Sequence, residues 1–306
     1  MQQWIRFVQR NGAVGFGFLI DAQPAGLSPQ TAARDLPSDG ADANALPHPP
    51  GTAATVADGA LAADLACHRP GGQVQVCTGN LFTQWEPTEL ALPLADLALL
   101  CPVIPTKMIG LWNNFHALAT KNGDADPAVP LYFLKAPNAW LAPGADIRAP
   151  AGYDGRVVYE GELGLVIGRR CHQVREEEAD DYLFGLTCIN DVTALSVLNE
   201  DPSFAQWTRA KGFDTFGPFG PCVVRGLDWS TLQIRTLVNG RERQNFPASD
   251  MILPPARIIS VISRELTLEP GDIIACGTSV GVLPIKPGTR IDVVIDGVGT
   301  LSNRLA

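Results

Sequence analysis

Apolar and polar residues alternate in short runs along most of this chain, which is the pattern of half-buried β-strands. The opening segment, IRFVQRNGAVGFGFLI (residues 5–20), alternates on both sides of Asn11-Gly12 and predicts a β-hairpin. Later strand-like runs are separated by turns that contain Gly or Pro. They read KMIGLW, LYFLKA, VVYEGELGLVIG, FGLTCIND, GPCVV, LQIRTLVNG, DIIACGT and RIDVVIDGVGTL.

Helical spacing of apolar residues is rare in comparison. ARIISVISREL (residues 256–266) has this spacing and predicts an amphipathic helix, which the turn Glu269-Pro270-Gly271-Asp272 follows. A short helix is expected after Asn190-Asp191-Val192-Thr193-Ala194. Many strands with few helices predict a mainly β fold with some α, in the form of a mixed β-roll or barrel.

The composition changes along the chain and suggests two parts. Residues 21–55 are rich in Ala, Pro, Asp and Gly and predict a long surface loop, and residues 57–67 predict an alanine-rich helix. Cys101-Pro102-Val103-Ile104-Pro105 has the character of a linker. We therefore expect a small α+β N-terminal domain over residues 1–98 and a larger main domain over residues 99–306.

Charge and hydropathy exclude several classes of protein. Lys and Arg are scattered through a chain of formal net charge −9, so the basic surface that binds nucleic acid is not expected. No apolar run approaches the ~20 residues that cross a bilayer, and the first residues lack the features of a signal peptide. These observations predict a cytoplasmic protein that binds neither nucleic acid nor membrane.

The cysteines and histidines do not suggest a metal or redox site. The seven cysteines form no CxxC pair, and several lie in apolar segments, so we expect them to be reduced and structural. The four histidines are too dispersed for a histidine-based metal site.

Carboxylates in apolar segments carry the strongest chemical signal. Glu160 and Glu162 alternate in the run VVYEGELGLVIG, so both would point to one face of a strand, roughly 7 Å apart. Two such carboxylates repel each other and lose solvation, and a bound cation would remove both penalties. The alternative is an edge strand on which both glutamates face water.

A third carboxylate, Asp191, ends the buried-looking segment FGLTCIND. Buried acids need a partner. If Asp191 reaches Glu160 and Glu162, the three form an all-oxygen site of the kind that hard divalent ions such as Mg²⁺ prefer.

The order of motifs from about residue 101 to the C-terminus resembles the fumarylacetoacetate hydrolase superfamily. The motifs are YFLKAPN, YEGELGLVIG, GLTCINDVTA, RAKGFDTFGPFGP, LVNGRERQ, LTLEPGDIIACGTSVGV and GVGTLSN. The resemblance implies a mixed β-roll and a metal site formed by Glu160, Glu162 and Asp191. It also implies dependence on Mg²⁺ or Mn²⁺, a small-molecule oxoacid substrate and a homodimer.

Other candidate site residues follow from the same motifs. The resemblance places Lys211 against the substrate, where an ammonium group can neutralise a carboxylate or stabilise an enolate. Lys135 would either approach the pocket or brace its loop. Thr278, with the neighbouring backbone N–H groups, would hold a substrate carboxylate, and Gln206 would make a polar contact. The alternatives are a surface lysine at Lys211 and a plain strand-end turn at Thr278.

The chain departs from the family pattern around the expected base. His116 matches a family histidine that pairs with a glutamate one turn later and activates water, but the corresponding residue here is Ala119. Asp124 and Asp126 are the candidate replacements, and the alternative is a structural histidine. The chain also has Ala194-Leu195 where the family often has Arg and Asp, and Ser279 where it has Pro.

The leading functional prediction is a metal-dependent hydrolase that cleaves a C–C bond in a 1,3-diketo acid through a metal-stabilised enolate. His116 would deliver the water, while Lys211 and Thr278 hold the substrate. Because the acid beside His116 is missing, a decarboxylase or an isomerase of a 2-oxo acid or hydroxymuconate-type product of aromatic catabolism is the alternative. A remote alternative is a non-catalytic metal-binding protein.

Overall fold

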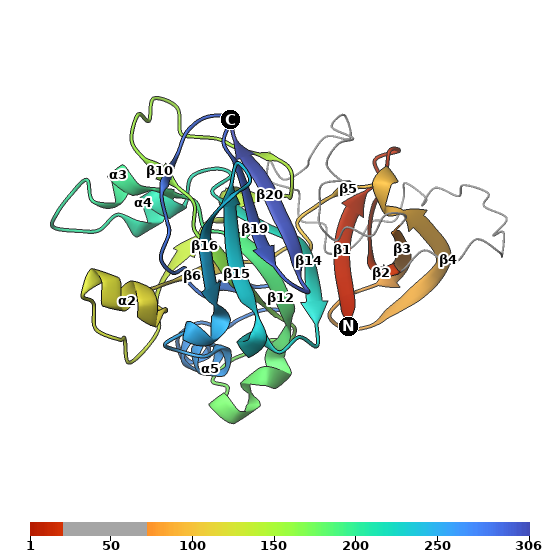
Figure 1. The fold of residues 1–306 in the computed structure, drawn as a ribbon. Helices are drawn as coiled ribbons and strands as arrows, with labels where there is room; N and C mark the ends of the chain where they lie inside the picture. Colours follow the sequence, from red (N-terminus) through yellow and green to blue (C-terminus); the bar gives the residue numbers. More distant parts are fainter. Residues whose placement is uncertain (21–71) are drawn as a thin grey trace.

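The computed structural model describes residues 1–20 and 72–306 and contains three β-sheets with short helices at their edges (Figure 1). The loop predicted at residues 21–55 and the helix predicted at residues 57–67 lie outside the described residues. The predicted mainly β fold with few helices is confirmed.

The largest sheet runs through both parts of the chain. Its path is β4 (Trp85–Pro93), β3 (Gln73–Gly79), β2 (Val14–Ile20), β1 (Gln2–Val8), β14 (Gly217–Arg225), β12 (Leu183–Asn190), β11 (Gly161–Ile167), β17 (Ile273–Ala275), β6 (Met108–Trp112) and β7 (Leu131–Lys135). Two short strands pair with it off this path, β5 (Ala98–Leu99) and β8 (Trp140–Leu141).

The remaining strands form two smaller sheets. One has the order β16 (Arg241–Pro247), β15 (Gln233–Val238), β19 (Arg290–Ile295), β20 (Gly299–Leu305) and β9 (Asp146–Ile147). The other has the order β13 (Thr193–Ala194), β10 (Val157–Val158) and β18 (Pro284–Ile285).

The helices are short. The α-helices are α2 (His116–Asn122), α3 (Leu195–Leu198), α4 (Trp207–Lys211) and α5 (Pro255–Glu265). Single 3₁₀ turns or short 3₁₀ segments lie at Leu94–Asp96, Pro137–Ala139, Glu176–Tyr182, Trp229–Thr231 and Ala248–Asp250. The predicted helix at residues 256–266 is confirmed as α5, which buries Ile258, Ile259 and Ile262 and has Pro255 in its first turn.

The predicted N-terminal hairpin is confirmed. Strands β1 and β2 pair from Trp4 with Phe18 to Val8 with Val14, and the turn contains Gly12 in the left-handed region, at φ +86°. Strand β1 also pairs with β14, so the N-terminal strands continue the main sheet. The domain boundary expected after residue 98 stays a prediction.

The core lies between the main sheet and the five-stranded sheet. Strands β11 and β12 pack against β15, β19 and β20, and side chains such as Leu163, Ile234 and Val293 are buried between them. Such burial on both faces makes β11 and β12 rigid supports for the polar side chains at their ends.

One predicted strand is wrong in its extent. The segment 157–168 was expected as one strand, but it forms β10 and β11 in two different sheets, with a bend at Tyr159-Glu160. The buried Tyr159 donates its hydroxyl to the carbonyl of Gly281 (2.7 Å), and the backbone N–H of Glu160 donates to the side chain of Asn190 (3.1 Å). These side-chain contacts replace strand pairing at the bend.

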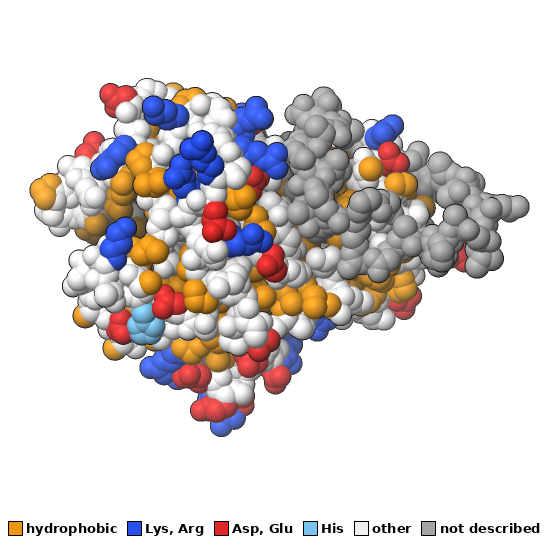
Figure 2. Space-filling view, viewed as in Figure 1, with side chains coloured by type: hydrophobic (Ala, Val, Ile, Leu, Met, Phe, Trp, Pro, Cys, Tyr) orange, Lys and Arg blue, Asp and Glu red, His pale blue; other side chains and the backbone are white. Residues whose placement is uncertain are grey.

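The surface and the cysteines agree with the sequence. Figure 2 shows basic, acidic and apolar side chains interspersed over one face of the molecule. The six described cysteines, Cys77, Cys101, Cys171, Cys188, Cys222 and Cys276, are buried and form no disulfide with one another, while Cys67 lies outside the described residues. Over residues 1–20 and 72–306, the helices are too short or too polar to span a membrane.

Candidate functional site

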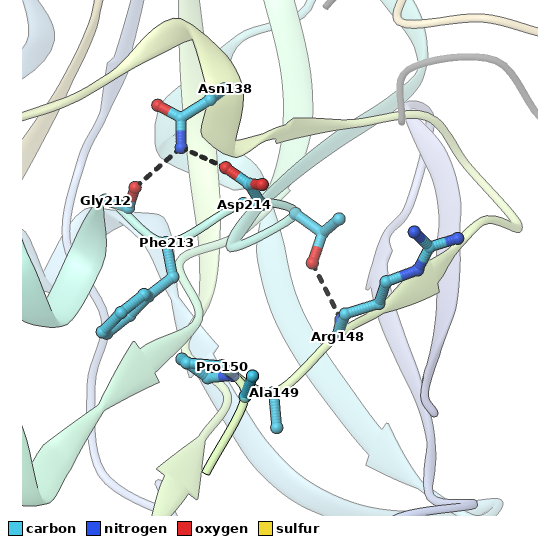
Figure 3. A pocket seen from close by; sticks show the side chains of 9 residues that line it. Asn138, Arg148, Ala149, Pro150, Gly212, Phe213 and Asp214 are labelled. Carbon is cyan, nitrogen blue, oxygen red and sulfur yellow. Dashed lines mark hydrogen bonds between the residues drawn. The ribbon is translucent and has the colours of Figure 1, made fainter. Parts of the chain in front are cut away.

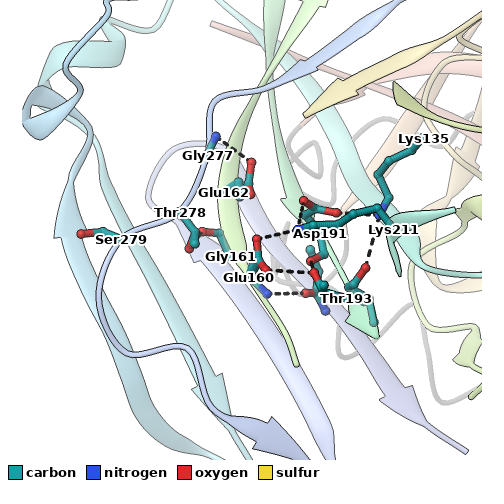
Figure 4. Close-up of polar contacts among 12 residues, drawn as sticks. Lys135, Glu160, Gly161, Glu162, Asp191, Thr193, Lys211, Gly277, Thr278 and Ser279 are labelled. Atoms are coloured by element: carbon teal, nitrogen blue, oxygen red, sulfur yellow. Dashed lines mark hydrogen bonds and ion pairs between the residues drawn. The ribbon is translucent and has the colours of Figure 1, made fainter. Parts of the chain in front are cut away.

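The three predicted carboxylates converge where β11 and β12 meet the bend before β11 (Figure 4). Gly161 on β11 lies opposite Asn190 on β12, and the backbone N–H of Asp191 donates to the carbonyl of Glu160 (2.9 Å). One carboxylate oxygen from each of Glu160, Glu162 and Asp191 lies within 4.8 Å of the others. The antiparallel register therefore brings together acids that are about thirty residues apart in the chain.

Both predicted lysines reach this centre. Lys135, at the end of β7, donates to Asp191 Oδ1 (2.5 Å), and it also donates to the carbonyl of Val192 (3.3 Å). Lys211, at the end of α4, donates to Asp191 Oδ2 (2.5 Å) and Glu160 Oε2 (2.8 Å). Each lysine is only 1% exposed, so both are part of the interior and Lys211 is not a surface lysine.

Glu162 is the least compensated of the acids. Its Oε2 accepts from the backbone N–H of Gly277 (2.8 Å), while its buried Oε1 has no hydrogen-bond partner in the structure. Burial, followed by the nearby Asp191 and Glu160 carboxylates, raises the pKa of Glu162 well above its ordinary value. A solvent-facing edge strand is therefore wrong for this glutamate, which is 0% exposed.

Burial and nearby charges shift the pKa values of the other two acids in opposite directions. Burial raises the pKa of Glu160 above its ordinary value, although Lys211 opposes the shift. Burial would also raise the pKa of Asp191, but the ammonium groups of Lys135 and Lys211 outweigh it and hold that pKa below its ordinary value. Asp191 is thus ionised inside the protein because two cations surround it.

The centre fits a hard divalent ion. Three carboxyl groups face only two lysines, and the free Oε1 of Glu162 is one available oxygen ligand. Mg²⁺ and Mn²⁺ prefer such oxygen ligands. Glu160, Glu162 and Asp191 are the residues that would hold the ion.

An aromatic group beside Lys211 was missed by sequence reasoning. The Lys211 ammonium lies 5.0 Å from the ring centre of Phe133, and Trp207 stacks on Phe133 with ring centres 5.3 Å apart. Trp207 precedes Lys211 by about one turn of α4, so it shares a helix face with the lysine. The i, i+4 spacing in WTRAK was the available signal.

The loop after β17 bonds to Glu162 and to the neighbouring Gly161. Besides Gly277, it contains Thr278, whose hydroxyl donates to the carbonyl of Gly161 (2.9 Å) and accepts from Gln244 (2.8 Å). The Thr278 hydroxyl thus points at β11, and its predicted contact with substrate stays a prediction. Gln244 was missed as a site residue, although it belongs to the motif LVNGRERQ.

The remaining predicted polar contact lies farther out. Gln206 precedes the first residue of α4, and its side-chain amide donates to the carbonyl of Phe204 (3.1 Å) in the exposed loop before the helix. Its predicted role in substrate binding stays a prediction. Thr193, which the sequence did not single out, donates its hydroxyl to Glu160 Oε1 (2.9 Å).

His116 is the first residue of α2 and has an acidic partner. Its Nδ1 lies 3.1 Å from Asp126 Oδ2, which selects Asp126 from the two candidates. Ala119, at the family's glutamate position, is 1% exposed and faces the interior. Asn114, two residues before His116, donates to the carbonyl of Cys276 (3.0 Å), so α2 starts beside the loop that holds Glu162.

A separate pocket of about 380 Å³ is lined in part by the residues that directly follow Lys211 (Figure 3). Asn138 donates there to Gly212 (3.0 Å) and to Asp214 (2.6 Å), and Arg148 lies on the opposite wall. Residues 138, 148–151 and 212–215 line it, and the carboxylates of the centre do not. This pocket is therefore distinct from the candidate metal centre.

Known proteins share the sequence motifs and the fold of this chain. Residues 107–306 match the family model of the fumarylacetoacetate (FAA) hydrolase C-terminal domain. A crystal structure of 2-hydroxyhepta-2,4-diene-1,7-dioate isomerase from Mycobacterium marinum is similar over 100% of this chain and 98% of its own, with 31% identity and a TM-score of 0.76.

Two further relatives cover the catalytic part. Oxaloacetate tautomerase YisK from Bacillus subtilis is 35% identical over 69% of this chain and 74% of its own length. Maleylpyruvate hydrolase from Sphingobium sp. SYK-6, solved with manganese(II) and pyruvate, is 32% identical over 71% of this chain and 76% of its own, with a TM-score of 0.61. The family match and the shared fold show that this chain belongs to the fumarylacetoacetate hydrolase family of enzymes.

Proposed function

We propose that this protein is a divalent-metal-dependent isomerase or tautomerase of a small 2-oxo acid. The observation that carries the proposal is the cluster of half-buried Glu160 with buried Glu162 and Asp191, three acids against two lysines, with a glutamate oxygen that has no hydrogen-bond partner. The similarity to an isomerase along the whole chain and to a tautomerase along the catalytic part supports this reaction over the hydrolysis that we expected from sequence.

The three carboxylates would hold Mg²⁺ or Mn²⁺ and orient the oxo-acid end of the substrate. When bound, the ion would supply Lewis acidity toward the keto oxygen and the enolate. Lys211 lies between Glu160 and Asp191, so its ammonium group is placed to offset negative charge that develops on the substrate. The Phe133 ring, on which Trp207 stacks, lies beside that ammonium group.

His116 is the proposed acid–base group. When its Nδ1–H donates to Asp126, the lone pair of Nε2 is free to accept a proton. In tautomerisation one proton leaves the enol hydroxyl and another is added to the neighbouring carbon, so the formula does not change. His116 Nε2 would carry the carbon-bound proton, giving it to the carbon when the enol becomes the keto form and taking it from the carbon in the reverse direction, while the hydroxyl proton passes to or from solvent.

C–C bond hydrolysis is the second candidate function. The same His116–Asp126 pair favours it, because a base with an orienting carboxylate can also take a proton from water. The similarity to maleylpyruvate hydrolase supports this alternative.

One substrate panel separates the reactions. Metal-free protein, restored with Mg²⁺ or Mn²⁺, would be mixed with enol oxaloacetate, a hydroxymuconate-type acid and an acylpyruvate. We expect the ultraviolet absorbance of the enol or diene to change at constant mass, faster than with metal ion alone. Formation of two acids would indicate a hydrolase and release of CO₂ a decarboxylase. No turnover of any of the three acids would contradict the proposal.

A further inference from the structure

The backbone of Gly161, between the two metal-site glutamates, lacks a strand partner on one side. Gly161 lies opposite Asn190 of β12 on the other side. Toward β17, strand pairing ends at Gly164 with Ala275, followed by a last bond from the N–H of Cys276 to the carbonyl of Leu163 (2.9 Å). The N–H and C=O of Gly161 therefore need partners from side chains, because buried backbone groups are costly to leave unpaired.

Gln244 and Thr278 supply these partners. The N–H of Gly161 donates to Gln244 Oε1 (3.0 Å), and the Thr278 hydroxyl donates to the carbonyl of Gly161 (2.9 Å). Gln244 Nε2 in turn donates to Thr278 Oγ1 (2.8 Å) and to the carbonyl of Ser279 (3.1 Å). The Gly161, Gln244 and Thr278 groups thus form a closed ring of three hydrogen bonds.

This hydrogen-bonded ring connects segments on both sides of Glu162. It joins the segment 160–162 to the loop 277–279, whose Gly277 N–H donates to Glu162 Oε2. Gln244 belongs to β16 of the five-stranded sheet and is 1% exposed, so it ties the two sheets together at the centre. No side chain fits at Gly161, because a Cβ there would lie 2.0 Å from Thr236 Oγ1.

We propose that Gln244 is a positioning residue for the carboxylate centre, which sets its affinity for a divalent ion without touching the ion. It does so by fixing Glu160 and Glu162 relative to the Gly277 N–H. The inference rests on the metal centre of the proposed function, but it is independent of which reaction that centre catalyses. Groups that orient metal ligands typically change metal affinity by about 10–100-fold when they are removed.

Titration of Mn²⁺ into metal-free protein tests this inference. Gln244→Met keeps the length of the side chain and removes its three hydrogen bonds, and we expect the affinity for Mn²⁺ to fall by about 10–100-fold. Thr236→Val is the matched control. Thr236 pairs with Gln244 across the two strands, is equally buried and contacts Gly161, but its hydroxyl has no hydrogen-bond partner in the structure. Its affinity should stay within about twofold of wild type.

Thr278→Val breaks the same ring at another member and serves if Gln244→Met does not fold. It should also weaken Mn²⁺ binding, and the two changes together should cost less than the sum of their separate effects, because both open one ring. Thermal unfolding of each metal-free variant separates stability from affinity. A wild-type affinity in Gln244→Met, or in Thr278→Val, would overturn the inference. Absence of Mn²⁺ binding by wild type would instead overturn the proposed function.

Discussion

The carboxylate centre and the His116–Asp126 pair differ in how firmly their side chains are held. Asp191 accepts from two buried lysines, and Glu162 accepts from a backbone N–H in a region closed to solvent. His116 and Asp126 pair with each other at 3.1 Å, and their side chains are 51% and 53% exposed. The first region is held from several strands, and the second lies on the surface of one short helix and the loop after it.

This difference suggests that the two regions have different roles: the carboxylate centre binds ion and substrate, and the His116–Asp126 pair decides which proton transfer follows. Electrostatic interactions are strong in a dry, preorganised interior and weak between exposed groups. The buried centre is therefore suited to hold an ion and an oxo acid in one geometry. The exposed pair can change its position and its access to water, and it is the place where tautomerisation and hydrolysis would diverge.

Removing one carboxylate from the buried centre should have the largest effect on activity. Glu162→Gln should lower kcat/KM by at least about 10³-fold, because a metal ion contributes several kcal/mol of transition-state stabilisation. Steady-state kinetics with added Mg²⁺ checks this, with Glu178→Gln, an exposed glutamate paired with Arg175, as the control. Activity within tenfold of wild type, or full wild-type activity in excess chelator, would contradict a catalytic metal.

Removal of the buried cation should have the next largest effect. Lys211→Met should lower kcat/KM by about 10²-fold or more, since it removes a charge-assisted contact from a dry site and leaves Glu160 and Asp191 less compensated. The exposed Lys121→Met, on α2, is the matched control. A loss below about threefold would show that Lys211 only stabilises the fold.

Changes in the exposed pair should affect kcat and leave ion affinity unchanged. His116→Asn should lower kcat by about 10²-fold, the lower end of general acid–base catalysis, and Asp126→Asn should lower it by less, because it removes only the orienting partner. His172→Asn, at an exposed histidine, is the control. A wild-type kcat in His116→Asn would assign the proton transfer to another group.

The smallest expected effect concerns stability without metal. Because the pKa of Glu162 is raised in the folded protein, the folded state favours the protonated acid, and ionisation destabilises it as pH rises above the unfolded pKa. Metal-free wild type should therefore lose stability relative to Glu162→Gln over the range upward from about pH 4.3, the ordinary pKa of a glutamate, by at most about 1.4 kcal/mol per pH unit. Melting temperatures across this range check the sign, and a constant difference would contradict it.

Much of the architecture followed from local patterns. The Asn11-Gly12 hairpin and the helix α5 have turn chemistry and apolar spacing that report on a few neighbouring residues. The carboxylate centre was predictable because acids in apolar strands need partners. Its two lysines came from the family motifs.

The features that could not be predicted from the sequence depend on contacts between distant segments. The bend at Tyr159 relies on Gly281, and the position of Gly161 relies on Gln244 and Thr278, none of which is near in sequence. The pairing of His116 with Asp126, ten residues later, also depends on how the loop after α2 folds back, which periodicity in a seven-residue helix does not reveal.

A crystal structure of the protein with Mn²⁺ tests the central claim most directly, because the anomalous signal of manganese locates the ion independently of activity. We predict one anomalous peak at coordination distance from oxygens of Glu160, Glu162 and Asp191, and its absence in crystals of Glu162→Gln grown in the same way. Wild-type crystals with no peak at this centre, and with Lys211 still bridging Glu160 and Asp191, would contradict it.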